Sequence, residues 1–155
     1  MTKRLSISHW RWRKLILDLR RRGEGRRESG AFLLAAPNGT RVSTHICYDD
    51  LDPLAHDSGI IVFHGAGYVR LWELCEVRQL RVIADVHTHP GDWTGQSHTD
   101  ATHPMIGIAG HIALIVPFFA QRNSYSLRGV GVHRYRGNHQ WQTCRPSSAF
   151  GLSLI

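Results

Sequence analysis

The sequence has 155 residues, of which 42% are hydrophobic and 20% are charged, and its formal net charge is +7. This composition excludes a disordered chain and a fibrous repeat, and the length predicts a single domain over residues 1–155 with a core of its own. The longest apolar stretch, residues 106–120, is interrupted by glycine, histidine and proline, and no secretory signal follows the basic amino terminus, so we expect a cytoplasmic protein without a membrane partner.

The first half of the chain predicts a helix, a β-hairpin and a second helix. Ser8 is placed to cap a helix that runs to about Arg22, because apolar residues recur at three- and four-residue spacing, and Gly23 and Gly25 end it. Residues 30–36 predict a buried strand, 37–39 a turn and 41–48 the return strand, followed by a polar loop rich in Asp. Residues 67–79 predict a helix with a broad apolar face, which carries Val69, Leu71, Trp72, Leu74, Cys75 and Val77.

The second half of the chain predicts the remainder of a sheet. Residues 80–86 form a continuous apolar run with one arginine, which is typical of a central strand, and residues 87–99 form a polar loop that leaves it. Residues 111–116 and 130–135 predict further strands, and 139–144 the last one. Together these elements indicate an α/β fold with a mixed central β-sheet flanked by helices.

The positive charge is local, since ten of the nineteen Lys and Arg residues precede residue 28. Such a patch is able to bind nucleic acid, an anionic membrane surface or an acidic protein surface. A run of this kind is more often a solvated helix face with its trailing loop, so nucleic acid is the less favoured partner.

The three cysteines, Cys47, Cys75 and Cys144, lie far apart and form no Cys-x-x-Cys pair. This spacing argues against a disulfide framework and against a cysteine-based zinc site. We therefore expect reduced, buried thiols.

A candidate metal site lies where the predicted central strand ends. His87 and His89 are two positions apart, so their imidazoles point to the same side of an extended chain. Neutral imidazoles are good zinc ligands, and catalytic zinc sites usually take three protein ligands and leave the fourth position to water. Asp100 is the candidate third ligand, eleven positions after His89. Ser97 or Thr99 would hold it in place by capping a short helix that begins near it.

Two further residues supply the groups that hydrolysis requires. Glu28 lies at the entrance to the first strand, where a carboxylate has no packing purpose, and it is the candidate acid/base that moves a proton from water to a leaving amine. Ser97 is the candidate hydrogen-bond donor to the developing oxyanion. The predicted reaction is the hydrolysis of an amide.

These residues and their spacing resemble the signature of the JAMM metallopeptidases, the active branch of the MPN (JAB) domain family. That signature is Glu, a variable gap, His-x-His, seven residues and Ser-x-x-Asp. It is matched here by Glu28, by His87-Thr88-His89, by residues 90–96 and by Ser97-His98-Thr99-Asp100. The segment ESGAFLLA also resembles the family's catalytic-glutamate strand, and the order of elements over residues 8–135 matches the family's layout.

The resemblance implies an MPN fold and a zinc isopeptidase that removes ubiquitin or ubiquitin-like proteins from lysine side chains. By this resemblance His87, His89 and Asp100 bind one zinc ion, Glu28 is the acid/base, and Ser97 supports the tetrahedral intermediate. The chain is similar to compact bacterial members found beside E1-like and E2-like enzymes, notably in antiphage operons. The implied partners are therefore a ubiquitin-like protein or its conjugate and those two enzymes. The chain has little room for the insertions that position a second ubiquitin in larger eukaryotic members.

Plainer interpretations exist for each of these residues. The histidine pair is also consistent with surface or core-edge histidines, Glu28 with a solvated carboxylate paired to a neighbouring arginine, and Ser97 with a helix cap, a role compatible with catalysis. Trp93 either contacts the substrate or covers the site as a lid. Three nearby histidines either hydrogen-bond to the ligands, act as alternative ligands or, as is more common, have no role in the site: His98, His103 and His111. Three other tryptophans are expected to be packing residues: Trp10, Trp12 and Trp72.

Two other functions compete with the peptidase. The basic first 27 residues also fit a nucleic-acid-associated protein, since a DNA-repair-associated branch of the same superfamily carries a similar metal motif. A non-catalytic scaffold ranks last, because scaffolding members of the family typically lose the metal ligands that this chain retains.

Overall fold

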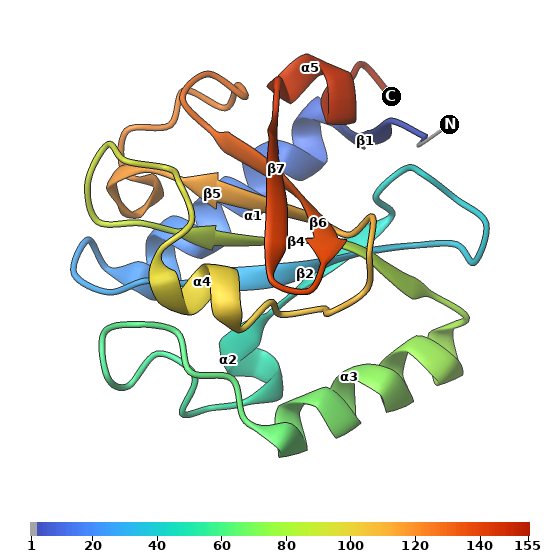
Figure 1. Cartoon of the computed structure of the whole chain (residues 1–155), viewed down its shortest axis with the longest axis horizontal. Helices are drawn as coiled ribbons and strands as arrows, with labels where there is room; N and C mark the ends of the chain where they lie inside the picture. Colours follow the sequence, from blue (N-terminus) through green and yellow to red (C-terminus); the bar gives the residue numbers. More distant parts are fainter. Residues whose placement is uncertain (1–2) are drawn as a thin grey trace.

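The computed structural model describes residues 3–155. Its centre is a six-stranded mixed sheet in the order β3-β2-β4-β5-β6-β7 (Figure 1). Within this sheet β4 and β5 pair in parallel and the other neighbouring strands are antiparallel. The strands are β2 (Gly30–Ala35), β3 (Thr44–Cys47), β4 (Arg81–Thr88), β5 (Ile112–Val116), β6 (Gly131–Gly137) and β7 (Gln140–Cys144). The mixed α/β architecture expected from the sequence is confirmed.

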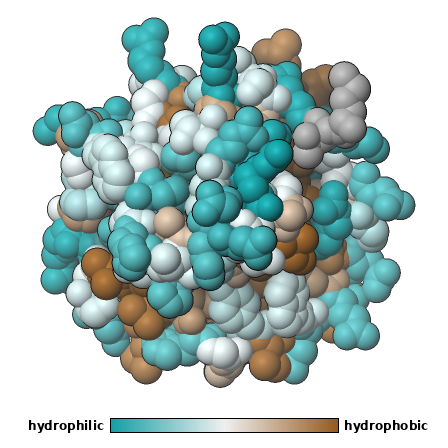
Figure 2. Space-filling model, viewed as in Figure 1, coloured by the Kyte–Doolittle hydropathy of each residue, from teal (hydrophilic) through white to brown (hydrophobic). Residues whose placement is uncertain are grey.

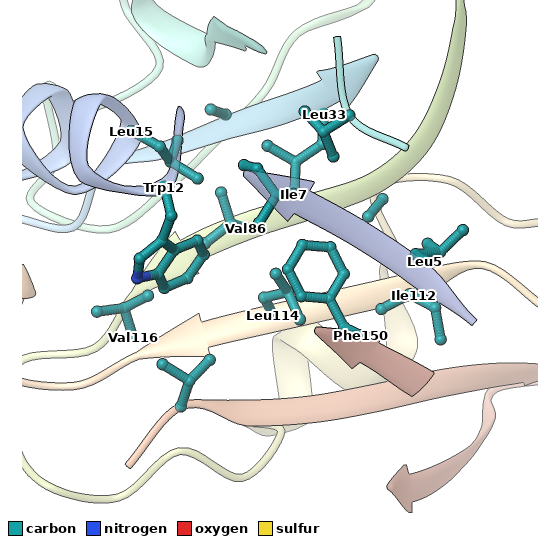
Figure 3. Close-up of a cluster of buried hydrophobic side chains, with 14 of the residues drawn as sticks. Leu5, Ile7, Trp12, Leu15, Leu33, Val86, Ile112, Leu114, Val116 and Phe150 are labelled. Carbon is teal, nitrogen blue, oxygen red and sulfur yellow. The ribbon is translucent and has the colours of Figure 1, made fainter. Parts of the chain in front are cut away.

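Helix α1 (His9–Gly23) covers one face of the sheet and lies behind it in Figure 1. Alternate residues of the central strands pack in one cluster with this helix, including Leu33, Val86 and Leu114. Trp12 is fully buried in the cluster, and its ring centroid lies 6.3 Å from that of Phe150 (Figure 3). Each fully buried Leu, Val or Phe stabilises the fold by about 1.5–3 kcal/mol, so this cluster fixes α1 against the sheet.

The opposite face of the sheet is covered by α2 (Tyr48–Leu51) and α3 (Gly65–Arg78). Phe32 and Leu34, the alternate residues of β2, pack here with Tyr48 and Leu71. The two-residue period of the strand thus divides β2 between two hydrophobic clusters. Helix α2 lies where the sequence analysis expected only a polar loop, because a single turn is too short to show a helical period.

A second, two-stranded sheet joins the beginning and the end of the described chain. β1 (Leu5–Ser8) pairs in parallel with β8 (Phe150–Ser153), which follows the short helix α5 (Pro146–Ala149). Residues 139–144 were expected to form the last strand; they do contain a strand, β7, but β8 follows it, so the expectation that it is the last one is wrong. Each of these strands has four residues and finds its partner at the other end of the sequence, so neither produces a hairpin signal.

Several predicted boundaries are corrected by the structure. Ser8 does precede α1, but its hydroxyl makes no capping hydrogen bond. The helix ends at Gly23, as expected, but the C-cap residue that takes the left-handed conformation, with φ 53°, is Glu24 rather than a glycine. α3 begins at Gly65, β3 is shorter than the predicted return strand, and β4 runs on to Thr88. This last extension places His87 inside the strand.

Two tryptophans expected to pack are exposed. Trp12 is buried, whereas Trp10 is 57% and Trp72 48% exposed. In α3 the buried side chains are Leu71 and Cys75, while Val69, Trp72 and Val77 face solvent, so the packed face is narrower than predicted. Figure 2 shows hydrophobic side chains at the lower edge of this view, where Figure 1 places α3 and the loop before it.

All three cysteines are free thiols, with Cys47 and Cys75 buried as expected and Cys144 only partly buried. Among the helices of residues 3–155, none combines the length and the apolar character that a bilayer crossing requires.

Candidate metal centre

Strand β4 carries the first candidate ligand. Its residues alternate, so Val86 packs in the cluster under α1 while Asp85 and His87 line a cavity on the other face of the sheet. His87 lies opposite Gly30 of β2, where a Cβ atom would come within 2.2 Å of the Tyr48 ring. Glycine at position 30 therefore lets that ring pack close to His87.

Helix α4 (His98–Thr102) positions the candidate carboxylate. Ser97 is its N-cap: the backbone N–H of Asp100 donates to Ser97 Oγ at 3.0 Å. In return the backbone N–H of Ser97 donates to Asp100 Oδ2 at 2.9 Å. This reciprocal capping box holds both side chains in place. Of the two predicted caps, Ser97 and Thr99, the structure has the first.

The structure brings the three candidate ligands together in one cluster. Nε2 of His87 lies 3.1 Å from Nε2 of His89. The carboxylate oxygens of Asp100 lie 3.1 Å from Nε2 of His89 and 3.4 Å from Nε2 of His87. Two zinc bonds of about 2.0–2.1 Å at a tetrahedral angle separate their donor atoms by roughly 3.3–3.4 Å. The two nitrogen atoms, and each nitrogen with one oxygen of Asp100, are thus spaced close to what a tetrahedral zinc site requires; Oδ1 faces His87 and Oδ2 faces His89.

The other ring nitrogen of His89 is also engaged. Nδ1 lies 3.0 Å from the carbonyl oxygen of Trp93, to which its N–H donates, so Nε2 keeps its lone pair for a metal. The Trp93 ring stacks on the His89 ring, with centroids 5.5 Å apart and an interplanar angle of 26°. Trp93 is 58% exposed, so it covers a candidate ligand and still offers one face to solvent.

Strand β6 holds the loop that carries Trp93. Nε2 of His133 lies 2.8 Å from the carbonyl oxygen of Thr94 and donates to it. A Cβ atom on Gly131 would lie 2.2 Å from that same oxygen, so only glycine allows the loop to approach the strand. Neither residue was predicted from the sequence. Their positions two apart on β6 were the available signal, but the partner loop is 39 positions away from His133.

Glu28 lines the same cavity as His87, Ser97 and Asp100. Its carboxylate accepts a hydrogen bond from the backbone N–H of Ile61. Burial raises the pKa of Glu28, and the nearby histidines oppose this rise without cancelling it. A carboxyl group with a raised pKa beside candidate metal ligands is suited to accept and release a proton.

The arginines beside Glu28 have other partners. Arg26 donates to a carboxylate oxygen of Glu24 at 2.8 Å, and Arg27 donates to the carbonyl oxygen of Arg22 at 3.0 Å. The plain interpretation of Glu28 as the partner of a neighbouring arginine is thus not what the structure shows.

Asp100 and His87 form a strongly coupled pair. Burial opposes ionisation of Asp100, but hydrogen bonds with His87 and His89 outweigh it and hold the pKa of the carboxyl well below its usual value. Burial likewise favours neutral His87, but its contact with Asp100 outweighs burial and raises the pKa of the imidazole. A proton or a metal ion bound between these side chains therefore stabilises the same arrangement.

A buried polar network lies next to the candidate ligands. Nε2 of His111 lies 2.6 Å from Asp85 Oδ1, and the Tyr48 hydroxyl donates to Asp85 Oδ2 at 3.3 Å. His111 thus pairs with Asp85 and is not part of the ligand cluster. His98 and His103 are exposed and also lie outside that cluster. The sequence analysis missed Asp85, although Asp85, His87 and His89 continue one two-residue period.

The cluster opens into a cavity of about 680 Å³. Glu28, His87 and Asp100 lie on its wall, together with the segment Ile60–Phe63 and the aromatic side chains of Tyr68 and Trp141. This volume lies within the range of about 300–1,000 Å³ that is usual for ligand sites. The site therefore combines candidate metal ligands with an apolar space able to receive a substrate.

Comparison with known proteins supports the fold. No protein-family model matches the chain. The structure is similar to protein DSY2949 from Desulfitobacterium hafniense, with a TM-score of 0.62 and 12% identity over 96% of this chain and 92% of that one. It is also similar to AF2198, a JAB1/MPN domain protein from Archaeoglobus fulgidus, with a TM-score of 0.54 and 13% identity over 97% of this chain and 99% of that one. At this identity the likeness concerns the fold alone: the chain has an MPN-like α/β fold, with a candidate metal site built on it.

Proposed function

We propose that the protein is a zinc-dependent peptidase of the JAMM type that cleaves an amide bond to a ubiquitin-like protein. The observation that carries the proposal is the close approach of donor atoms from His87, His89 and Asp100, beside a cavity that His87, Asp100 and Glu28 line. The MPN-like fold and the complete JAMM-like signature support the same assignment.

In this proposal Glu28 moves the proton. A bound zinc ion supplies a Lewis acid and lowers the pKa of water toward neutrality. Glu28 accepts the proton of the attacking water as the new C–O bond forms, and then donates it to the amine nitrogen as the C–N bond breaks. Its raised pKa suits both steps, because a carboxylate that holds its proton more tightly is a better proton acceptor and can still release the proton to the amine.

In the same proposal Ser97 both caps α4 and takes part in catalysis. Its Oγ accepts the backbone N–H of Asp100, which leaves the hydroxyl hydrogen available to the cavity that Ser97 lines. That hydrogen can be donated to the oxyanion of the tetrahedral intermediate. The capping box orients this donor before the substrate arrives, since both of its hydrogen bonds form within the protein.

The substrate class is the finer part of the proposal. The resemblance to compact bacterial JAMM proteins supports a ubiquitin-like protein, its lysine conjugate or its precursor, with E1-like and E2-like enzymes as partners in an antiphage conjugation system. The apolar segment Ile60–Phe63 lines the cavity beside Glu28 and offers a wall against which an extended substrate tail can lie.

Cleavage of ubiquitin-like fusions tests the proposal. The probes are ubiquitin and any ubiquitin-like protein that is encoded beside this gene, each fused through its carboxyl terminus to a reporter. We expect zinc-loaded protein to release the reporter and Asp100→Asn to lose both zinc and release. Protein that holds zinc at His87 and His89 but cleaves neither these fusions nor their lysine conjugates would refute the substrate class.

The nucleic-acid alternative receives less support from the structure. Five of the basic residues near the amino terminus are engaged within the protein, among them Arg20, which donates to the carbonyl oxygen of Ala120 at 3.0 Å, and Arg22, which pairs with Asp49 at 2.7 Å. The other three are Arg21, Arg26 and Arg27. These contacts favour a basic segment whose side chains bind other residues of the same protein. Steeply salt-dependent binding of duplex DNA would reverse this preference.

A further inference from the structure

We propose a second metal site, on the face of the sheet opposite the cavity, formed by Asp18 of α1 and by His45 and Cys47 of β3. One donor atom from each of the three residues lies within 4.8 Å of the other two. A carboxylate oxygen, an imidazole nitrogen and a thiolate sulfur form a mixed donor set that suits Zn²⁺. The proposed ligand is therefore one zinc ion, held independently of the ion proposed for the cavity.

The alternation of β3 brings two of these donors to one side. His45 and Cys47 are two positions apart, and they lie opposite Leu33 and Ala31 of β2, which belong to the cluster packed under α1. Ile46, between them, packs in the cluster of the other face. The backbone thus directs both donors toward α1, where Asp18 meets them.

The three side chains are shielded to different degrees. Cys47 is 1% exposed, and the side chains of His45 and Asp18 are 10% and 21% exposed. Nε2 of His45 lies 2.7 Å from Asp18 Oδ2. A hydrogen bond accounts for this pair, and the thiol of Cys47, which also packs in the cluster under α1, lies within 4.8 Å of both donor atoms. The partial exposure of Asp18 leaves a path by which a metal ion enters and by which water completes its coordination.

Small side-chain movements suffice to close the site. Zinc bonds of about 2.0–2.3 Å at tetrahedral angles place donor atoms roughly 3.3–3.8 Å apart. The Asp18 and His45 atoms, now 2.7 Å apart, must therefore move apart to roughly 3.3 Å. The widest spacing between donor atoms, at most 4.8 Å, must shorten by about 1 Å. Zinc binding also releases the thiol proton of Cys47 to solvent, because the thiolate is the ligand.

The charges around the cluster are compatible with a cation. Arg22 lies one turn after Asp18 on α1, and its guanidinium is held by Asp49 at 2.7 Å and Asp50 at 2.8 Å. Lys14 also faces His45 from α1, and Arg21 pairs with the outer oxygen of Asp18. Zinc with one thiolate and one carboxylate is neutral overall; relative to the empty cluster, in which the thiol is protonated, binding adds one positive charge. A bound zinc ion would link α1 to β3, the edge strand of the sheet.

Cobalt substitution separates the proposed sites, because a thiolate bound to Co²⁺ gives a near-ultraviolet charge-transfer band that histidine and carboxylate ligands do not. Metal-stripped protein is titrated with Co²⁺, and the metal retained after gel filtration is counted. We expect two ions per chain and a thiolate band in the wild type. Cys47→Ser should retain one ion and lose the band. Cys75→Ser, the matched change of another buried thiol, should retain both ions and the band.

The controls also distinguish this proposal from the proposed function. Asp100→Asn should lose the ion of the cavity and keep the thiolate band, and a protein that fails as a peptidase can still show the band. If Cys47→Ser does not fold, the double variant Cys75→Ser/Cys144→Ser decides the question, because a band that it retains must come from Cys47 and loss of the band excludes Cys47 as a ligand. The absence of a thiolate band at saturating Co²⁺, or a band that survives in Cys47→Ser, would overturn the second site.

Discussion

The carbonyl oxygen of Trp93 accepts the Nδ1–H of His89 at 3.0 Å, and the Trp93 ring stacks on the same imidazole. The backbone contact fixes which nitrogen faces the cavity, while the ring restrains the rotation of the imidazole. The two contributions are separable by mutation, because the carbonyl remains when the side chain is truncated.

Trp93→Ala should weaken zinc binding by about tenfold, at the low end of the range for residues that orient a metal ligand. The carbonyl still selects the Nε2 lone pair, so binding should not be abolished. Competition with a chromophoric chelator measures the affinity. Trp10→Ala, which removes another exposed tryptophan, serves as the control and should have no effect. Equal affinities for the wild type and Trp93→Ala would show that the stacking contributes nothing.

Glu28→Gln should lose turnover and keep the metal. Glutamine retains the shape of the side chain but cannot carry the proton, so a decrease in kcat of about 10²–10⁴-fold is expected. Reporter release from the fusion measures turnover, and metal analysis of the same sample measures zinc. Full activity in this variant would remove Glu28 from the mechanism, whereas loss of zinc would identify it as a ligand.

Gly131→Ala should disturb the candidate site from a distance. The new Cβ would lie 2.2 Å from the carbonyl oxygen of Thr94, so the loop that carries Trp93 must move. We expect zinc affinity to fall by about 10–100-fold, as for other substitutions of residues that orient a metal ligand. Gly107→Ala is the matched control, because its Cβ would have no neighbour closer than 3.9 Å. Equal affinities in the two variants would contradict this role of Gly131.

The stability of the metal-free protein should depend on pH through Asp100 and His87. The depressed pKa of Asp100 stabilises the fold above its unfolded value of 3.8, and this contribution is lost as the pH falls through the folded pKa. The raised pKa of His87 stabilises the fold below its unfolded value of 6.5, and this contribution is lost as the pH rises through the folded pKa. The stabilising effect of the pair is therefore complete between these two values.

Asp100→Asn should accordingly destabilise metal-free protein most between about pH 4 and 6.5, and by less as the pH rises further. Urea unfolding of both metal-stripped proteins across pH 4 to 8 measures the difference. Asparagine keeps an oxygen to accept the Ser97 N–H, so the helix cap is largely preserved. A difference independent of pH would show that the ionised pair does not stabilise the fold.

The two neighbouring tryptophans of α1 should differ sharply in their effect on stability. Trp12 is fully buried, so Trp12→Ala should lower the free energy of unfolding by about 3–5 kcal/mol. Trp10 is 57% exposed, and Trp10→Ala should change it by no more than about 0.5 kcal/mol. Chemical denaturation of the two variants checks this contrast, and similar losses would contradict the packing described for α1.

The candidate ligands could be predicted from the sequence because their geometry is local. His87 and His89 follow from the two-residue period of a strand, and the capping box ties Asp100 to Ser97 over three positions. Glu28 was suggested only by its place at the entrance to a strand, and its spacing from the ligands could not test this, because it reaches the cavity through the pairing of β2 with β4. For that residue the resemblance to a known signature supplied what spacing alone did not.

The residues that surround the ligands depend on tertiary contacts and were not predicted. Asp85 meets His111 across 26 positions, and His133 meets the Thr94 carbonyl across 39. The exposure of Trp10 and Trp72 was missed for a related reason, since a periodic apolar pattern does not show how wide a face its partner covers.

The pairing of β1 with β8 also affects how the chain is made. Leu5 lies opposite Phe150, so the two strands are separated by 145 positions (150 − 5), and Phe150 packs against Trp12 of the first helix. During synthesis the apolar side of α1 therefore leaves the ribosome long before the strand that completes its cover. Contacts between such distant segments form slowly and leave apolar surface exposed in the meantime. The nascent protein should depend on chaperones until residue 153 has emerged, and aggregation should exceed that of a variant in which the two strands are brought close in sequence by circular permutation.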